Sequence, residues 1–334
     1  MNNKNQRLTA SEISVIWSSY INNTFSTCIL KYFLRNVEDT KIKHVLQLAF
    51  KISENNVKKC KEILELDDQS IPVGFTDHDV SPSAPRLYSD AFYLYYLKNM
   101  SKVGLSVYGV ALCTSANKDV RDLLSKAIQE STDLYNKTAE VLLSEGIYIR
   151  PPYVTTSNQK SFINSKGYLS GLMHTHHRPI NVLEITHIEA NIEANSVGRA
   201  LLAGFSQVAK SKKVRDYCTR GKEISKKHIK VFAGMLTEDD LPAPMPWDVE
   251  VTDSTIAPFS DKLIMFHISL LIASSISNYA TAAAASLRTD ISADYIRLSG
   301  ENAKYAKDGL DIMIKNNWLE EPPQIPDHEG LAKD

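Results

Sequence analysis

The chain has 334 residues, with 38 basic and 39 acidic side chains and a formal net charge of -1. This balance produces no overall field that would attract nucleic acid or an anionic membrane, so we expect neither as a partner. The length exceeds the usual size of a domain with one core. We therefore expect two domains, each with its own hydrophobic core.

The cysteines and the chain start indicate a cytoplasmic protein. Cys28, Cys60, Cys113 and Cys218 lie far apart within helical patterns and form no C-x-x-C pair, which is typical of reduced core thiols. The polar N-terminus leads directly into a helix cap, so we expect no signal peptide. The most apolar window, residues 263–285, contains four serines, a histidine and an asparagine, which favours a buried helix over a membrane span.

Apolar residues with a period of 3.6 predict four helices in the first half of the chain. Thr9 and Glu12 form a capping box that opens a helix ending near Asn36. Asp39 or Thr40 caps a second helix, which ends near Leu66. A proline-bearing loop follows, and it is too long for a tight turn. The third and fourth helices are predicted at residues 89–116 and 118–145.

The second half repeats this plan. Three short segments recur at a nearly constant offset: Ile71-Pro72 as Leu241-Pro242, Tyr88-Ser89-Asp90 as Phe259-Ser260-Asp261, and Pro151-Pro152 as Pro322-Pro323. Equal offsets indicate a tandem repeat. The corresponding helices are predicted at residues 181–209, 214–236, 260–287 and 290–316. We therefore divide the chain into a first unit at 1–150, a linker at 151–179 and a second unit at 180–334.

The fold class predicted from these elements is all-α. Each unit has four helices, two short connections and one long loop between its second and third helices, as in ferritin-like four-helix bundles. We predict two tandem bundles related by a pseudo-twofold axis or a simple rotation, with the proline loops at 71–86 and 241–259 in equivalent places.

One segment carries a resemblance to a known family. It contains Arg178, the sequence Glu184-Ile-Thr-His187, Gly198, Leu201 and residues 204–232. This segment resembles an uncharacterised, spore-coat-protein-like family of spore-forming bacilli. The resemblance implies a ferritin-like bundle in each half and an association with sporulation, the spore or the spore coat. It brings no established activity and no catalytic residue.

A polar row on the helix predicted at 181–209 is the first candidate for function. Counting by helical angle, we find five inward-facing candidate metal ligands on the helices of the second unit: Glu184, His187, His228, His267 and Glu301. Ferritin-like di-metal sites need four carboxylates and two Glu-x-x-His motifs, whereas this set has two carboxylates and one such motif. The residues thus support at most a single site for iron, manganese or zinc.

A second interpretation needs no ion. Glu184 and the histidines would pair with one another and with Asn191 and Asn195 as a buried polar network, and we prefer this interpretation. A third interpretation is that these residues bind a small organic ligand. The first unit keeps two glutamates, Glu12 and Glu130, but the positions of the three histidines fall on or next to Val15, Val57 and Tyr96. Any metal site is therefore expected only in the second unit.

Two further patterns are open to interpretation. The histidine cluster at 174–177 lies in a glycine-containing linker, where an exposed turn or an interdomain contact is favoured over a metal site. The aromatic run Phe92, Tyr93, Tyr95 and Tyr96 contains more rings than one inner face needs. Some of these rings must be covered by the other bundle or by another chain, which indicates self-association or protein partners.

These observations lead to two hypotheses of different classes. The sequence contains no nucleophile elbow and no glycine-rich phosphate loop, so we expect no catalytic residue and no cofactor. The first hypothesis is a non-enzymatic structural or interaction protein associated with sporulation or the spore coat. The alternative is a metal-binding ferritin-like protein with one histidine and carboxylate site in its second bundle.

Overall fold

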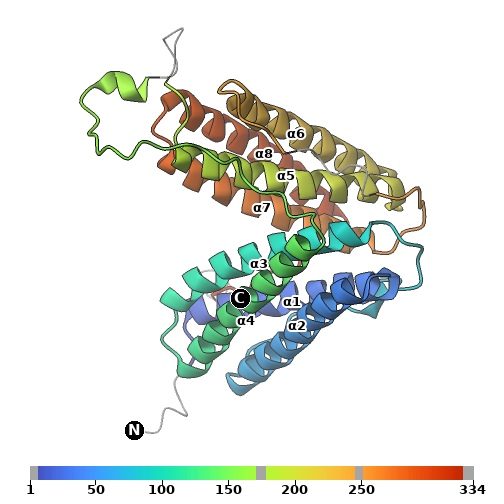
Figure 1. Ribbon diagram of the computed structural model, residues 1–334. Coiled ribbons are helices and arrows are strands. Elements are labelled where there is room, and N and C mark those ends of the chain that lie inside the picture. The colour runs from blue at the N-terminus through green and yellow to red at the C-terminus, as the bar shows by residue number, and fades with distance from the viewer. Residues whose placement is uncertain (1–6, 171–177, 245–250, 326–334) are drawn as a thin grey trace.

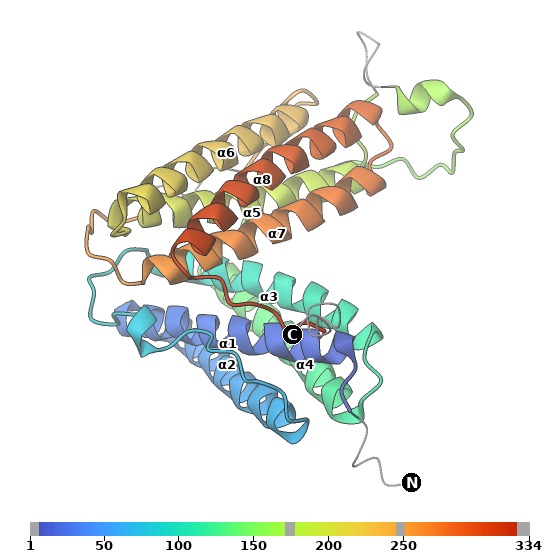
Figure 2. The same cartoon turned by 180° about the vertical axis from the view of Figure 1, so that it is seen from behind.

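The computed structural model describes residues 7–170, 178–244 and 251–325, and these residues form two four-helix bundles (Figures 1 and 2). The first bundle consists of α1 (Ala10–Asn36), α2 (Thr40–Leu66), α3 (Asp90–Cys113) and α4 (Lys118–Ser144). The second consists of α5 (Val182–Val208), α6 (Lys212–Thr237), α7 (Asp261–Ala285) and α8 (Thr289–Lys315). The predicted all-α fold with two tandem four-helix bundles is confirmed.

Helix starts and ends follow local chemistry that the two bundles share. The hydroxyl of Thr9 accepts a hydrogen bond from the Glu12 amide, and the Glu12 carboxylate accepts one from the Thr9 amide. The equivalent pair in the second bundle is Asn181 and Glu184. These reciprocal bonds satisfy amides that have no partner within the helix. An aspartate in the left-handed backbone conformation follows the second helix of each bundle, Asp68 in the first and Asp240 in the second.

The long loops between the second and third helices of the bundles pair with each other. Val80 forms an antiparallel bridge with Phe259, and Tyr88 forms one with Val251. By the repeat offset, Val251 is the equivalent of Val80, and Phe259 is the equivalent of Tyr88. Each bridge is thus the image of the other with the two repeats exchanged. This reciprocity is the signature of a twofold contact, and it supports the predicted pseudo-twofold relation.

Each loop also sends an aromatic side chain onto the first helix of the opposite bundle. The Tyr88 hydroxyl donates to the Leu201 carbonyl at 2.9 Å, and its ring lies against Gly204, where an added Cβ would come within 2.5 Å of the hydroxyl. In the reverse direction, the Phe259 ring meets the Tyr32 ring edge-on at 5.1 Å. Glycine at 204 therefore admits the Tyr88 ring to the helix backbone.

The expectation of two separate cores is wrong. One central cluster of buried apolar residues contains members of both bundles, including Phe25, Phe33, Phe92, Phe205 and Ile264, while a smaller cluster lies at the far end of each bundle. The aromatic run at 92–96 explains why, because its four rings are at most 4% exposed and face this shared cluster. The bundles merge where they meet, since neither covers these rings alone.

Helix α7 is the one described helix that is long and apolar enough to cross a membrane by length and composition. Its first half, with Leu263, Ile264 and Ile268, is buried within the protein. A core helix of a bundle has the same composition, so this feature is weak evidence for a span.

The shared core leads to a first prediction. Residues 1–159 expressed alone should not form a folded monomer, because removing the second bundle would expose Tyr88, Phe92 and the unpaired loop backbone. Since the loop contacts are reciprocal, we expect this fragment to form a homodimer through the same loop. Light scattering after size exclusion measures the mass. A monomer with full helicity and cooperative unfolding would contradict the prediction.

Candidate functional site

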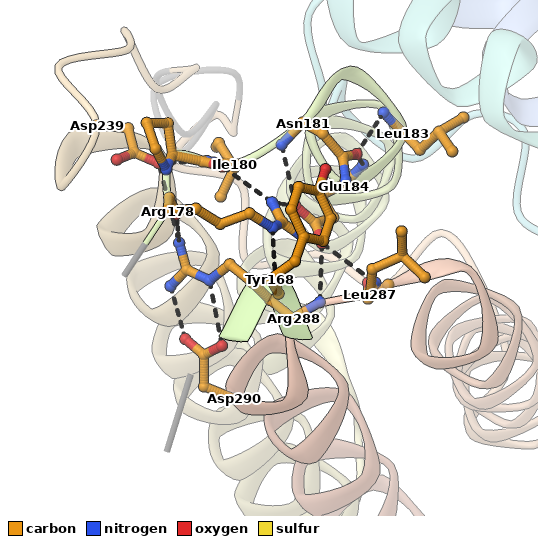
Figure 3. A network of polar contacts seen from close by, with 12 residues as sticks. Tyr168, Arg178, Ile180, Asn181, Leu183, Glu184, Asp239, Leu287, Arg288 and Asp290 are labelled. Carbon is orange, nitrogen blue, oxygen red and sulfur yellow. Dashed lines mark hydrogen bonds and ion pairs between the residues drawn. The ribbon is translucent and has the colours of Figure 1, made fainter. Parts of the chain in front are cut away.

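Glu184, one of the five predicted ligands, lies at the start of α5, and protein donors surround its carboxylate (Figure 3). Arg178 donates to both of its carboxylate oxygens, at 2.9 and 2.7 Å. The backbone amides of Leu287 and Arg288 donate to Oε1 at 3.1 and 3.0 Å, and the Asn181 amide donates to Oε2 at 3.0 Å. Glu184 therefore joins the linker, α5 and the connection between α7 and α8.

These donors determine the charge state of Glu184. Burial opposes ionisation, but the Arg178 guanidinium and the backbone amides of Asn181 and Arg288 outweigh it and lower the pKa of the carboxyl. Arg178 is itself held in place, because its guanidinium lies 4.2 Å from the Tyr168 ring centre and donates to the Tyr168 carbonyl. The carboxylate is thus charged, paired and closed to an incoming ion.

Glu12 has the same position in the first bundle. Its carboxylate accepts hydrogen bonds from the amides of Ala116 and Asn117 at 2.8 and 2.6 Å. By the repeat offset, these amides are the equivalents of those of Leu287 and Arg288, so the two glutamates join equivalent connections. Among the described residues, no arginine pairs with Glu12 as Arg178 pairs with Glu184. The shared contacts identify both glutamates as structural ties between the first helix and the connection that precedes the fourth.

His228 and Glu301 are the two predicted ligands that the structure brings together. His228 Nε2 lies 3.4 Å from a Glu301 oxygen, and Nδ1 lies 3.0 Å from the Tyr279 hydroxyl, which also accepts from the Asn195 amide at 2.7 Å. Burial lowers the pKa of His228 to about 4, although Glu301 opposes this effect. The imidazole is thus neutral at pH 7, and because a carboxylate only accepts, Nε2 carries the proton.

The first bundle has a related polar group at the same level. Its members Asn23, Asn56 and Tyr108 are the repeat equivalents of Asn195, His228 and Tyr279. The Asn23 amide donates to the Tyr108 hydroxyl at 3.4 Å, and the Asn56 amide donates to the Asn23 oxygen at 3.4 Å. The equivalent of His228 is therefore Asn56, next to the predicted Val57. A buried polar layer is common to both bundles, and the imidazole is particular to the second.

The other predicted ligands lie elsewhere. His267 is buried in the shared core, its ring 4.8 Å from that of Phe25 and 5.5 Å from that of Tyr96, and neither ring nitrogen has a hydrogen-bond partner among the described residues. Burial lowers its pKa to about 3. His187 is partly exposed on α5. The histidine cluster at 174–177 lies outside the described residues.

The five candidates thus do not form one coordination sphere. Within the described parts of the chain, no group of three or more histidine, cysteine or acidic side chains is placed to hold an ion. His228 and Glu301 alone offer two ligands, and Glu301 already pairs with Lys227 at 2.7 Å and Arg297 at 3.1 Å. A single metal at this point would need further ligands and the displacement of these cations.

Sequence reasoning missed a second polar site, between the bundles. A cavity of about 220 Å³ is lined by residues of α3, α4, α5 and the segments after α4 and α6. In its wall, Lys98 and Lys102 of α3 both pair with Glu193 of α5, at 2.8 and 2.6 Å. The helical periodicity of the sequence did not indicate this site, because charged residues on a helix normally face water.

Comparison with known proteins agrees with the repeat. A family model described as "Protein of unknown function (DUF3231)" matches residues 1–159 and again residues 170–331. A solved structure described as a "putative spore coat protein" from Bacillus halodurans C-125 is 17% identical, with a TM-score of 0.43; the match covers 46% of this chain and 100% of that one. No curated protein matches the chain.

The two glutamate ties give a matched pair of variants. Glu184→Gln should destabilise the protein by about 3 kcal/mol, because it leaves the guanidinium of Arg178 buried without its counter-charge. Glu12→Gln should cost about 1–3 kcal/mol, since it weakens hydrogen bonds without leaving a buried cation. Urea unfolding measures both. An equal or larger loss in Glu12→Gln would contradict the assigned role of Arg178.

The pH dependence of unfolding provides the control. A carboxyl whose pKa is lowered on folding stabilises the protein above its unfolded-state pKa, and this contribution disappears as pH falls through the folded-state value. Wild-type stability should therefore fall more steeply than that of Glu184→Gln as the pH is lowered through the acid range. Parallel curves for the two proteins would show that Glu184 is not preferentially ionised in the folded state.

Proposed function

The chain belongs to the DUF3231 family of proteins of unknown function, whose model matches it twice in tandem, and we propose that it is a non-enzymatic structural or interaction protein. The observation that carries the proposal is that Glu12 and Glu184 have the same structural role in the two bundles. Each ties the start of a first helix to the connection before the fourth, through equivalent backbone amides. Glu184, a predicted metal ligand, thus supports the bundle.

The thiols support the same proposal. Cys28, Cys60 and Cys218 are buried, and burial raises the pKa of each to about 12. A buried thiol of high pKa is a poor nucleophile, because the thiolate is the reactive species. His228 and His267 are neutral at pH 7, so these three thiols and two imidazoles are not poised for nucleophilic attack or general-acid catalysis at neutral pH.

The proposal includes a place in sporulation. Its support is the resemblance of the segment from Arg178 to Phe232 to the spore-coat-protein-like family of spore-forming bacilli. Protein partners or further copies of the chain belong to the same proposal, because a structural protein acts through assembly. The alternative function is a metal-binding protein, and the contact between His228 and Glu301 is the observation that favours it.

A metal titration separates these two functions. We expect manganese, iron(II) and zinc to leave the thermal unfolding of the wild type unchanged, and to act no differently on His228→Asn, which installs the residue found at Asn56. A bound ion would instead stabilise the wild type by about 2.7 kcal/mol at a hundredfold excess over Kd. A metal-dependent gain that His228→Asn removes would establish the alternative.

The sporulation context has its own test. A fluorescent fusion of the full chain, expressed in a sporulating bacillus, should move to the spore and remain with it through washing in salt. Free fluorescent protein provides the control for trapping. A fusion that stays in the soluble fraction of the mother cell and is absent from washed spores would overturn this part of the proposal.

A further inference from the structure

The cavity between the bundles has room for a compact ligand. Its volume of about 220 Å³ corresponds to roughly seven waters at ~30 Å³ each. Its lining includes Lys98 and Lys102 on α3 and Glu189 and Glu193 on α5. The lining also includes the apolar residues Ile149, Pro151 and Pro244. Charged and apolar lining residues together suit a compact ligand with one polar end.

The charged part of the lining has an excess of positive charge. Lys98 is 2% exposed, and its ammonium pairs with Glu193 and lies 4.2 Å from the Tyr148 ring centre. Lys102 pairs with the other oxygen of the same carboxylate. Each ammonium has three donors and uses one of them on Glu193. One carboxylate therefore serves two cations, and donors remain for a further acceptor.

Glu189 is the unpartnered group of the site. It is 7% exposed, and its Oε1 has no hydrogen-bond partner among the described residues. Glu193 lies one turn further along α5, and burial together with this neighbouring carboxylate raises the pKa of Glu189 to about 7. Near neutral pH, Glu189 thus exists in both forms. Its protonated form is a hydrogen-bond donor that lines the same cavity as the two ammonium groups.

The pseudo-twofold axis supplies an internal comparison. The positions equivalent to Glu189 and Glu193 are Trp17 and Ile21, and those equivalent to Lys98 and Lys102 are Ser269 and Ala273. The same junction on the other side of the axis thus has no charged residue at any of these positions. Burying ions costs free energy that apolar packing avoids. The charges of the cavity are therefore not a requirement for holding the bundles together.

We propose that this cavity binds a small organic anion, a monocarboxylate with a compact apolar body. The carboxylate of the ligand accepts hydrogen bonds from Lys98 and Lys102 and from the protonated carboxyl of Glu189, while its body contacts the apolar lining residues. Such a ligand neutralises the excess charge and provides the missing partner of Glu189. This site is separate from the glutamate ties, so it goes beyond the structural role proposed above.

The experiment uses two probes of the same shape and opposite charge, benzoate and benzylamine, titrated calorimetrically into the full chain. We expect benzoate to bind at pH 6 and benzylamine not to bind. Above pH 7, the affinity for benzoate should fall, by up to about tenfold per pH unit. Ionised Glu189 repels the anion, so binding requires the uptake of one proton. Absence of saturable benzoate binding, or preferential binding of benzylamine, would overturn the proposal.

The other groups that face Glu189 do not account for this pH profile. Lys98 and Lys102 hold the pKa of Glu193 below its ordinary value despite its burial, and burial raises the pKa of Tyr135 to about 12. Glu189→Gln should therefore bind benzoate with an affinity that is constant from pH 6 to pH 8, since glutamine keeps a donor and removes the titration. A wild-type pH profile in Glu189→Gln would contradict the proposal.

Two further variants complete the design. Lys102→Met should weaken benzoate binding at least tenfold, because it removes one of the two cations. Glu130→Gln is the matched control: one buried oxygen of Glu130 also has no hydrogen-bond partner among the described residues, but Glu130 lies on α4 outside the lining of this cavity. Its benzoate affinity should equal that of the wild type. An equal loss of benzoate affinity in Lys102→Met and Glu130→Gln would indicate a general structural effect and overturn the assignment.

Discussion

Each bundle leaves a face of aromatic side chains uncovered, and the other bundle is the surface that covers it. The rest of the structure depends on this mutual burial. Tyr88 reaches α5 and Phe259 reaches α1, while the loops that carry them pair at Val80 and Val251. Apolar burial is the dominant favourable contribution to folding, so the junction between the bundles belongs to the core of the protein. The helices also diverge from this junction (Figure 1), where the inter-bundle cavity lies beside α3 and α5.

Much of the fold could be predicted because its signals are local. Capping residues such as Thr9 and Ser260 act within one helical turn, and a repeat offset needs no knowledge of contacts. The candidate site depended on longer-range information. Helical periodicity indicates which face of α5 carries Glu184 but not its partners. Arg178 precedes the helix, and the Arg288 amide lies 104 residues further along the chain. One local signal was available, since Asn181 and Glu184 have the spacing of a capping box.

The lack of information on long-range contacts also explains why the surroundings of His267 and the burial of Lys98 and Glu193 were not predicted. His267 lies on an inner face, as periodicity predicts, but the rings around it include Phe25 of the opposite bundle, which no helical pattern of α7 contains. Lys98 and Glu193 are charged residues on helices and would ordinarily face water. They are buried because a second bundle lies against the first. Contacts across the junction are thus where sequence reasoning failed, although the aromatic run at 92–96 correctly predicted that some contact must exist.

The reciprocal bridges between Val80 and Phe259 and between Tyr88 and Val251 have a consequence for how such a protein changes over evolutionary time. Contacts of this kind are those of two identical subunits, in which every substitution appears on both sides of the axis. Covalent fusion removes that obligation. Each copy can then differ from the other, as asparagine at 56 differs from histidine at 228, and charged residues can lie on one side of the junction alone. The single chain thus combines a dimer-like architecture with two halves that can be substituted independently.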